Sequence, residues 1–74
     1  MNTSEKTILF EYAHNELNTH NKAFAAYNNN PDNRTLKNKY FGSVQRMGVV
    51  NELLEALGYY IDIDDKIKKF DEND

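Results

Sequence analysis

The first candidate for chemistry is a carboxylate–imidazole pair at a spacing that helical iron proteins use. Glu11 and His14 form a Glu-x-x-His pair, and Glu52 and Glu55 lie on a later helical segment. In di-iron bundles such side chains project into the bundle interior, where they hold the metal. At 100° per residue, Glu11 and His14 point away from the apolar stripe around Leu9 and therefore toward solvent. The sequence predicts no metal site here and no cofactor.

A histidine within an apolar stripe is the second candidate. His20 lies one helical turn after Glu16, and a buried pair of this kind can exchange protons with a substrate. The sequence pattern places no serine beside His20 as a nucleophile, and the chain has no cysteine. We therefore expect a partly buried histidine at a helix seam and no enzyme. A small-ligand pocket at a dimer seam near His20 and Tyr27 is an alternative.

An acidic pattern near the C-terminus is similar to the opening of a calcium-binding loop. Asp62 and Asp64 have the spacing of the first ligands of an EF-hand loop. That loop needs an acid or amide at its fifth position and glycine at its sixth, where this chain has Lys66 and Ile67. The pattern therefore predicts a solvated acidic turn.

Positive charge is concentrated in the middle of the chain. Residues 34–46 carry four cations and no acid, whereas the whole chain has a net charge of −3. These cations are Arg34, Lys37, Lys39 and Arg46. Nucleic-acid-binding domains are usually basic, so the overall charge disfavours DNA or RNA as a partner. Nucleic-acid or anion binding by residues 34–46 remains an alternative function.

Two long helices must position all of these side chains. Apolar residues recur every three or four positions over residues 5–27 and over residues 31–57, which is the helical period. Between them lies a short loop over residues 28–30, and Asn30 with Pro31 is a good start for the second helix. Gly58 suits the position just after a helix end. So short a connection predicts an all-α, antiparallel two-helix hairpin.

The two apolar stripes of this hairpin are long. They consist of Leu9, Ala13, Leu17, His20, Phe24 and Tyr27 in the first helix, and of Leu36, Tyr40, Val44, Met47, Val50, Leu54 and Leu57 in the second. Gly42 and Gly48 lie inside the second helix at a cost of up to about 1 kcal/mol each. Either glycine would kink the helix or let a bulky residue of the first helix approach closely.

We expect residues 1–74 to form one domain that ends in a short segment over residues 59–70. Alternating apolar residues predict an extended stretch after Gly58. The spacing of Ile63, Ile67 and Phe70 favours a helical turn over residues 65–70. Residues 71–74 are expected to fray.

The second helix has more apolar surface than one partner helix can cover. Val49, Leu53, Ala56 and Tyr60 form a second stripe away from the main one. Either the C-terminal segment folds back over Val49 and Leu53, or two hairpins pair into a four-helix bundle, and we expect both. The residues expected at a partner interface are Phe41, Val49, Leu53, Tyr59 and Tyr60.

The chain resembles the small helical accessory proteins of bacteriophages and other mobile elements of AT-rich Gram-positive hosts. The resemblance rests on its 74 residues, its eleven asparagines, its lack of cysteine and the helix end Asn51-Glu52-Leu53-Leu54-Glu55-Ala56-Leu57-Gly58-Tyr59. It implies a self-associating protein that inhibits or adapts a larger host or viral complex, in some cases against host defence. No apolar run reaches the roughly 18 residues of a membrane span. We therefore expect a cytoplasmic protein, in the host cytoplasm if phage-encoded.

Overall fold

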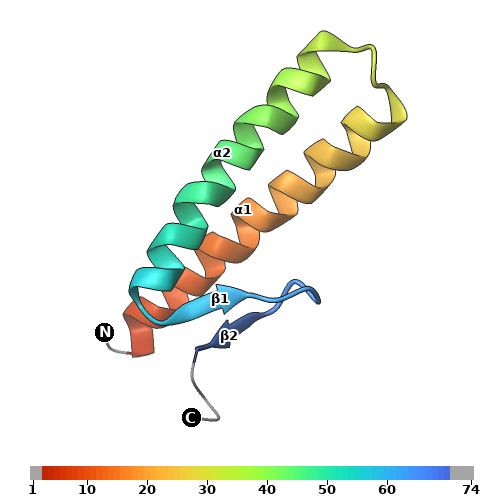
Figure 1. Ribbon diagram of the computed structural model, residues 1–74. Coiled ribbons are helices and arrows are strands. Elements are labelled where there is room, and N and C mark those ends of the chain that lie inside the picture. Colours follow the sequence, from red (N-terminus) through yellow and green to blue (C-terminus); the bar gives the residue numbers. More distant parts are fainter. Residues whose placement is uncertain (1–2, 71–74) are drawn as a thin grey trace.

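A computed structural model describes residues 3–70, which form two long helices followed by a small β-hairpin (Figure 1). Helix α1 spans Thr3–Asn29 and helix α2 spans Arg34–Ala56. Strands β1 (Tyr59–Ile61) and β2 (Ile67–Lys69) pair in an antiparallel sheet. The predicted antiparallel helical hairpin is confirmed. Helix α1 extends beyond the predicted residues 5–27 at both ends.

The second helix begins later than the sequence suggested. Asn33, not Asn30, is its N-cap, and the Asn33 side chain accepts a hydrogen bond from the Leu36 N–H at 3.1 Å. Asn30 and Pro31 instead begin a tight turn, which the Asn33 N–H closes by donating to the Asn30 carbonyl at 3.0 Å. Both residues suit that turn, because asparagine favours its first position and proline its second. The prediction of Pro31 as the first helical residue was wrong, since Asn33 is an equally good cap three residues later.

The far end of α2 matches the prediction closely. The helix ends at Ala56, and Gly58 adopts a φ of +89°, a conformation that side chains other than glycine rarely adopt. The helix continues without interruption through Gly42 and Gly48. A Cβ atom added to either of them would meet nothing within 4 Å. The expected close approach of a bulky side chain from α1 to these glycines is therefore absent.

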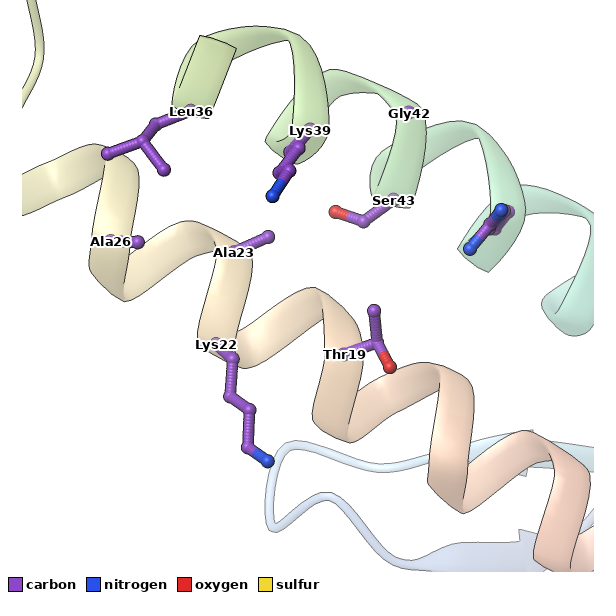
Figure 2. Close-up of a pocket in the computed structure, with 9 residues that line it drawn as sticks. Thr19, Lys22, Ala23, Ala26, Leu36, Lys39, Gly42 and Ser43 are labelled. Atoms are coloured by element: carbon purple, nitrogen blue, oxygen red, sulfur yellow. The ribbon is translucent and has the colours of Figure 1, made fainter. Parts of the chain in front are cut away.

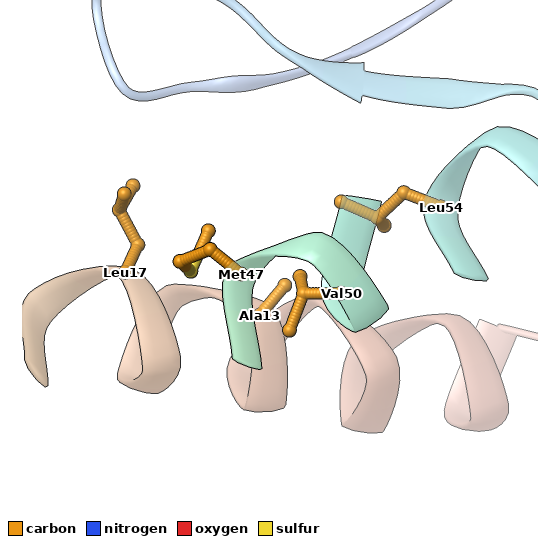
Figure 3. Close-up of a cluster of buried hydrophobic side chains, with 5 residues drawn as sticks. All are labelled: Ala13, Leu17, Met47, Val50 and Leu54. Carbon is orange, nitrogen blue, oxygen red and sulfur yellow. The ribbon is translucent and has the colours of Figure 1, made fainter. Parts of the chain in front are cut away.

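The core of the described residues is small and lies where the helices cross. Its buried apolar residues are Ala13, Leu17, Met47, Val50 and Leu54 (Figure 3). Ala13 and Val50 are completely buried between the helices. Figure 3 shows Leu17, Met47 and Leu54 on the side of the helix pair that faces the β-hairpin, which forms a third layer there. Its inward side chains are Tyr59, Ile61 and Ile67, which pack against the core beside Leu9 and Phe10.

The expected helical turn over residues 65–70 is wrong, because that segment is the second strand of the β-hairpin. Ile61 pairs with Ile67, which brings both side chains to the core face together with Tyr59. The turn between the strands needs a residue at positive φ, and Asp65 adopts +63°. Ile63, whose spacing suggested a helix, is 98% exposed in this turn. Ile67 packs against core residues that are distant in the sequence, and the spacing of apolar residues within the segment does not reveal this contact.

A lysine holds the acidic turn together. Lys68 Nζ lies 2.6 Å from one carboxylate oxygen of Asp62 and 3.3 Å from one of Asp64. The Lys68 hydrogen bond and the Ile63 N–H lower the pKa of Asp62 below its ordinary 3.8. Partial desolvation acts to raise the pKa of Asp64, but the Lys66 N–H and Lys68 outweigh it, and that pKa is lowered too. The two carboxylates in turn raise the pKa of Lys68.

These shifts predict that the β-hairpin loosens in acid. Because the folded-state pKa of Asp62 is lowered, its stabilising effect is present above about pH 3.8 and is lost as pH falls through the folded value. NMR shifts of Tyr59 and Ile67 followed from pH 6 to pH 2 should show the hairpin signals collapsing toward random-coil values below pH 4. In Asp62→Asn this acid step should shrink, and an unchanged step would show that other carboxylates control it.

Replacing Gly48 or Gly58 by alanine should change the free energy of unfolding in opposite directions. Gly48→Ala should raise the free energy of unfolding by up to about 1 kcal/mol, since alanine is the better helix former and its Cβ meets open space. Gly58→Ala should lower it by about 1–2 kcal/mol, because alanine is strained at a left-handed φ. Urea denaturation of both variants beside the parent chain measures the two changes. Two changes of the same sign would contradict the helical conformation of Gly48 or the left-handed conformation of Gly58.

Candidate functional site

A groove of about 570 Å³ lies between the two helices near the loop that joins them. Its lining residues are Thr19, Lys22, Ala23 and Ala26 of α1, and Leu36, Lys39, Gly42, Ser43 and Arg46 of α2 (Figure 2). Three of these are cations and none is an acid. An anionic group or an acidic surface is therefore the electrostatically favoured occupant.

Small side chains form most of the groove wall. In Figure 2, Ala23 and Ser43 point toward each other from opposite helices, and Lys39 reaches toward α1 beside them. Gly42 has open space where its Cβ would be. Because alanine and glycine do not fill the gap between the helices, the groove is open to a side chain from another molecule.

A buried polar pair lies at the inner wall of the groove. Ser43, which is 5% exposed, has its Oγ 3.0 Å from His20 Nδ1 and 2.6 Å from the Tyr40 carbonyl oxygen. A hydroxyl has one proton, and the Tyr40 carbonyl can only accept, so the Ser43 hydroxyl donates there and accepts from His20. The sequence pattern did not reveal that Ser43 lies beside His20. This arrangement nevertheless directs the hydroxyl proton away from the imidazole, which is the opposite of an activated nucleophile.

An aromatic cluster fills the seam at the same end of the molecule. Tyr40 lies at its centre, with ring centroids of His20, Phe24 and Tyr27 each 5.5 Å away. Phe41 lies 5.8 Å from Tyr40 and carries Lys37 over its ring at 5.6 Å. The seam near His20 and Tyr27, which was one candidate for a ligand pocket, is thus occupied by the chain's own Tyr40. Phe24, expected in the core, is 49% exposed.

The groove continues along the helices as an exposed apolar surface. Tyr12 lies roughly 140° around α1 from Leu17, and Val49 lies roughly 160° around α2 from Met47. Both therefore point away from the core residues that the β-hairpin covers. Ile8 is 67% exposed, Val49 61% and Leu53 43%. The C-terminal segment does fold back on the helices, but it leaves Val49 and Leu53 uncovered.

We call this surface the open face. It consists of Ile8, Tyr12, Glu16, Thr19, Ala23 and Ala26 on α1, and of Lys39, Gly42, Arg46, Val49, Leu53 and Ala56 on α2. Successive residues of each stripe are three or four positions apart, so each stripe runs straight along its helix. The groove half runs from Thr19 to Ala26 and from Lys39 to Arg46. The bulky half holds Ile8, Tyr12, Val49 and Leu53.

The five residues expected at a partner interface lie in three places. Val49 and Leu53 belong to the open face. Tyr59 is part of the fold, because its ring packs edge-on against Phe10 with centroids 5.0 Å apart. Tyr60 contacts Phe70 at 4.8 Å in the β-hairpin. Phe41 belongs to the aromatic cluster and is half exposed.

The structure brings together only part of the predicted anion site. Lys39 and Arg46 line the groove, whereas Lys37 lies over the Phe41 ring and Arg34 does not line the groove. Lys22 of α1 also lines the groove, with its side chain extending away from α2 in Figure 2, and the sequence analysis missed it. Lys22 is 17 positions from Lys39, so only the pairing of the two helices relates them.

Residues 3–70 hold no cluster of three or more histidine and acidic side chains that could bind a metal ion. Glu11 and His14 are both exposed. Over the same residues, neither helix carries an apolar stretch long enough to cross a lipid bilayer.

Comparisons with known proteins give no match to a family profile, to a curated protein or to a solved structure.

The His20–Ser43 bond predicts a stability effect at this site. Ser43→Ala should lower the free energy of unfolding by about 1–3 kcal/mol, because it leaves a half-buried imidazole nitrogen without its partner. Thr7→Ala is a matched control, since the Thr7 hydroxyl also bonds a carbonyl of its own helix but is exposed. The control should change stability by no more than about 0.5 kcal/mol. Equal effects of the two substitutions in urea denaturation would contradict a structural role for the bond.

Proposed function

We propose that this protein is a non-enzymatic protein-binding module that associates with a second copy of itself through the open face. Two helical hairpins would then pack into a four-helix bundle. The observation that carries the proposal is the exposure of Ile8, Tyr12, Val49 and Leu53 on one side of the helix pair, opposite the side that the β-hairpin covers.

The energetic argument starts from the small core. A domain of this size buries little surface, and the stability of small domains is only a few kcal/mol. Full burial of a large aliphatic side chain contributes about 1.5–3 kcal/mol. Covering the bulky half of both copies would therefore add a contribution comparable to the stability of one isolated chain.

A second copy is favoured as the partner because the open face has complementary halves. Its groove half carries Lys22, Lys39 and Arg46 at the groove, whereas its bulky half has no cation and is bordered by the exposed Glu52. A two-fold interface uses the same patch on both molecules, so it needs this kind of self-complementarity.

The wider role in this proposal comes from the resemblance to phage and mobile-element proteins. In that role the dimer acts in the host cytoplasm as an accessory or inhibitor of a larger host or viral complex, including complexes of host defence. The half-exposed Phe41, with Lys37 over its ring, supports a second contact surface on each copy. Exposed aromatic residues with cationic neighbours are frequent at interface hot spots.

Anion binding is the second candidate function, and the three cations of the groove support it. Its signature is binding of DNA, RNA or a phosphorylated ligand that weakens steeply as salt rises. Fluorescence anisotropy with labelled oligonucleotides at about 50 mM salt decides this alternative. It should be abandoned if no nucleic acid and no phosphate-containing ligand binds there.

Self-association predicts a concentration-dependent assembly. At tens of micromolar the chain should elute as a dimer in size-exclusion chromatography with light scattering, and its melting temperature should rise with concentration. Val49→Glu and Leu53→Glu should each raise the dissociation constant about tenfold or more, because each places a charge in an apolar interface. Both substitutions introduce glutamate, a good helix former, into α2.

Ile63→Glu is the matched control, since Ile63 is 98% exposed in the β-hairpin turn. It introduces the same charge without touching the open face and should leave the dimer intact. A monomer at these concentrations, with a melting temperature independent of concentration, would rule out the proposed self-association.

A further inference from the structure

We infer that the groove is the docking site for the bulky half of a second copy, so that the two hairpins lie with their loops at opposite ends. This inference rests on the proposed self-association and specifies its geometry. In this arrangement the two-fold axis lies in the plane of the interface, perpendicular to the helices, at the middle of the open face. Each α1 then lies against the partner's α1, and each α2 against the partner's α2, in antiparallel directions.

The positions of the stripe residues fix which side chains meet. The open face runs from Ile8 to Ala26 on α1 and from Lys39 to Ala56 on α2. A two-fold axis through the middle of both stripes places Ile8 opposite Ala26 and Leu53 opposite Gly42. Tyr12 then enters the groove between Thr19 and Ala23 of the second copy.

The size of the side chains favours this orientation. Ile8, Tyr12 and Leu53 of one copy face small residues of the other, whereas Val49 faces Arg46, and the groove of about 570 Å³ is filled twice. With the loops at the same end, α1 of each copy would face α2 of the other at the same level along the helices. Gly42 of one copy would then lie near Ala23 of the other, and the two grooves would face each other. Interiors of proteins are close-packed, and cavities of this size are costly.

The charges are divided between the two orientations. With the loops at the same end, Lys22 and Lys39 of both copies gather at one end of the dimer, but Glu16 faces Arg46 of the second copy. With the loops at opposite ends, Lys39 approaches the end that carries the exposed Glu52, whereas Arg46 of the two copies, and likewise Glu16, meet near the axis. The sizes of the side chains therefore decide the orientation.

Gly42 is consistent with the same orientation, although Gly48, which lies outside the open face, has equally open surroundings. A glycine within a helix costs up to about 1 kcal/mol relative to alanine. Nothing in this chain requires that glycine, because an added Cβ would meet no atom within 4 Å. Close approach of Leu53 from a second copy explains the small residue at this position, since a side chain there would occupy the space that Leu53 enters.

Two measurements test the orientation. Gly42→Leu adds a large side chain at the groove, and its Cβ would meet no atom of the described residues within 4 Å. It should weaken the dimer about tenfold or more in light scattering while the circular dichroism of the helices is kept. With the loops at the same end, the added leucine would fill an empty space and leave the dimer intact or tighter.

Disulfide trapping gives the second measurement, because the chain has no cysteine of its own. A mixture of the single variants Ile8→Cys and Ala26→Cys should form a mixed disulfide under mild oxidation. Ala26→Cys alone should not, because its two copies lie about 27 Å apart along the helix direction. Cross-linking of Ala26→Cys to Lys39→Cys instead, with a dimer that tolerates Gly42→Leu, would overturn the orientation and leave self-association standing. A chain that stays monomeric in every measurement would overturn both.

Discussion

The contact on which this structure depends is the packing of Ala13 against Val50 where the helices cross. Both residues are completely buried, and only Leu17, Met47 and Leu54 join them in the buried apolar core of residues 3–70. Because α1 presents alanine at the crossing, the helix axes can approach closely, but few methyl groups are buried there. A hairpin with so thin a seam needs further apolar contacts on one or both of its sides.

The β-hairpin supplies these contacts on one side only. Gly58 turns the chain out of α2 at a positive φ, and the following strands place Tyr59, Ile61 and Ile67 against the core. Asn21 of α1 donates a hydrogen bond of 3.4 Å to Asp65, which ties the hairpin turn to the helices. The five residues 62–66 that join the two strands are too few to reach the other side of the helix pair as well. The exposure of the open face therefore follows from the direction in which the chain leaves α2.

The sequence reveals those parts of the fold that rest on local periodicity. The helix pair and the apolar stripe at Val49 and Leu53 follow from spacings of three and four residues, and the stop follows from Gly58. The expected cover of Val49 and Leu53 by the C-terminal segment was wrong, because both remain exposed. The helix start was misplaced because Asn30 and Asn33 are equivalent caps when read alone. The second strand was missed because the pairing of Ile61 with Ile67 depends on a core that local spacing does not describe.

The site was less accessible to sequence analysis than the fold. The His20–Ser43 bond joins residues 23 positions apart, and Lys22 reaches the groove only because α1 and α2 pair in one particular register. In that register Ala13 and Val50 are both completely buried in the core. A wheel drawn for each helix separately shows the apolar stripes but cannot show which polar side chains of the two helices become neighbours.

The distribution of side-chain size at the loop end gives the strongest reason to regard the open face as an interface. On the seam at this end the chain places the rings of Tyr27 and Tyr40, stacked with centroids 5.5 Å apart. On the adjoining open face it places Ala23, Ala26 and Gly42. A surface selected only for solvation would favour long helix-forming residues such as lysine, glutamate and glutamine, which shield the backbone and cost little entropy.

The other half of the same face departs from a solvated surface in the opposite sense. Ile8, Val49 and Leu53 are large, apolar and 43–67% exposed, and Val49 is also a poor helix former. Each half alone is an unfavourable surface, because the groove half leaves a groove unfilled and the bulky half exposes large apolar side chains. Together they have the opposite shapes that two copies need in order to bury both, and one two-fold contact removes both defects at once.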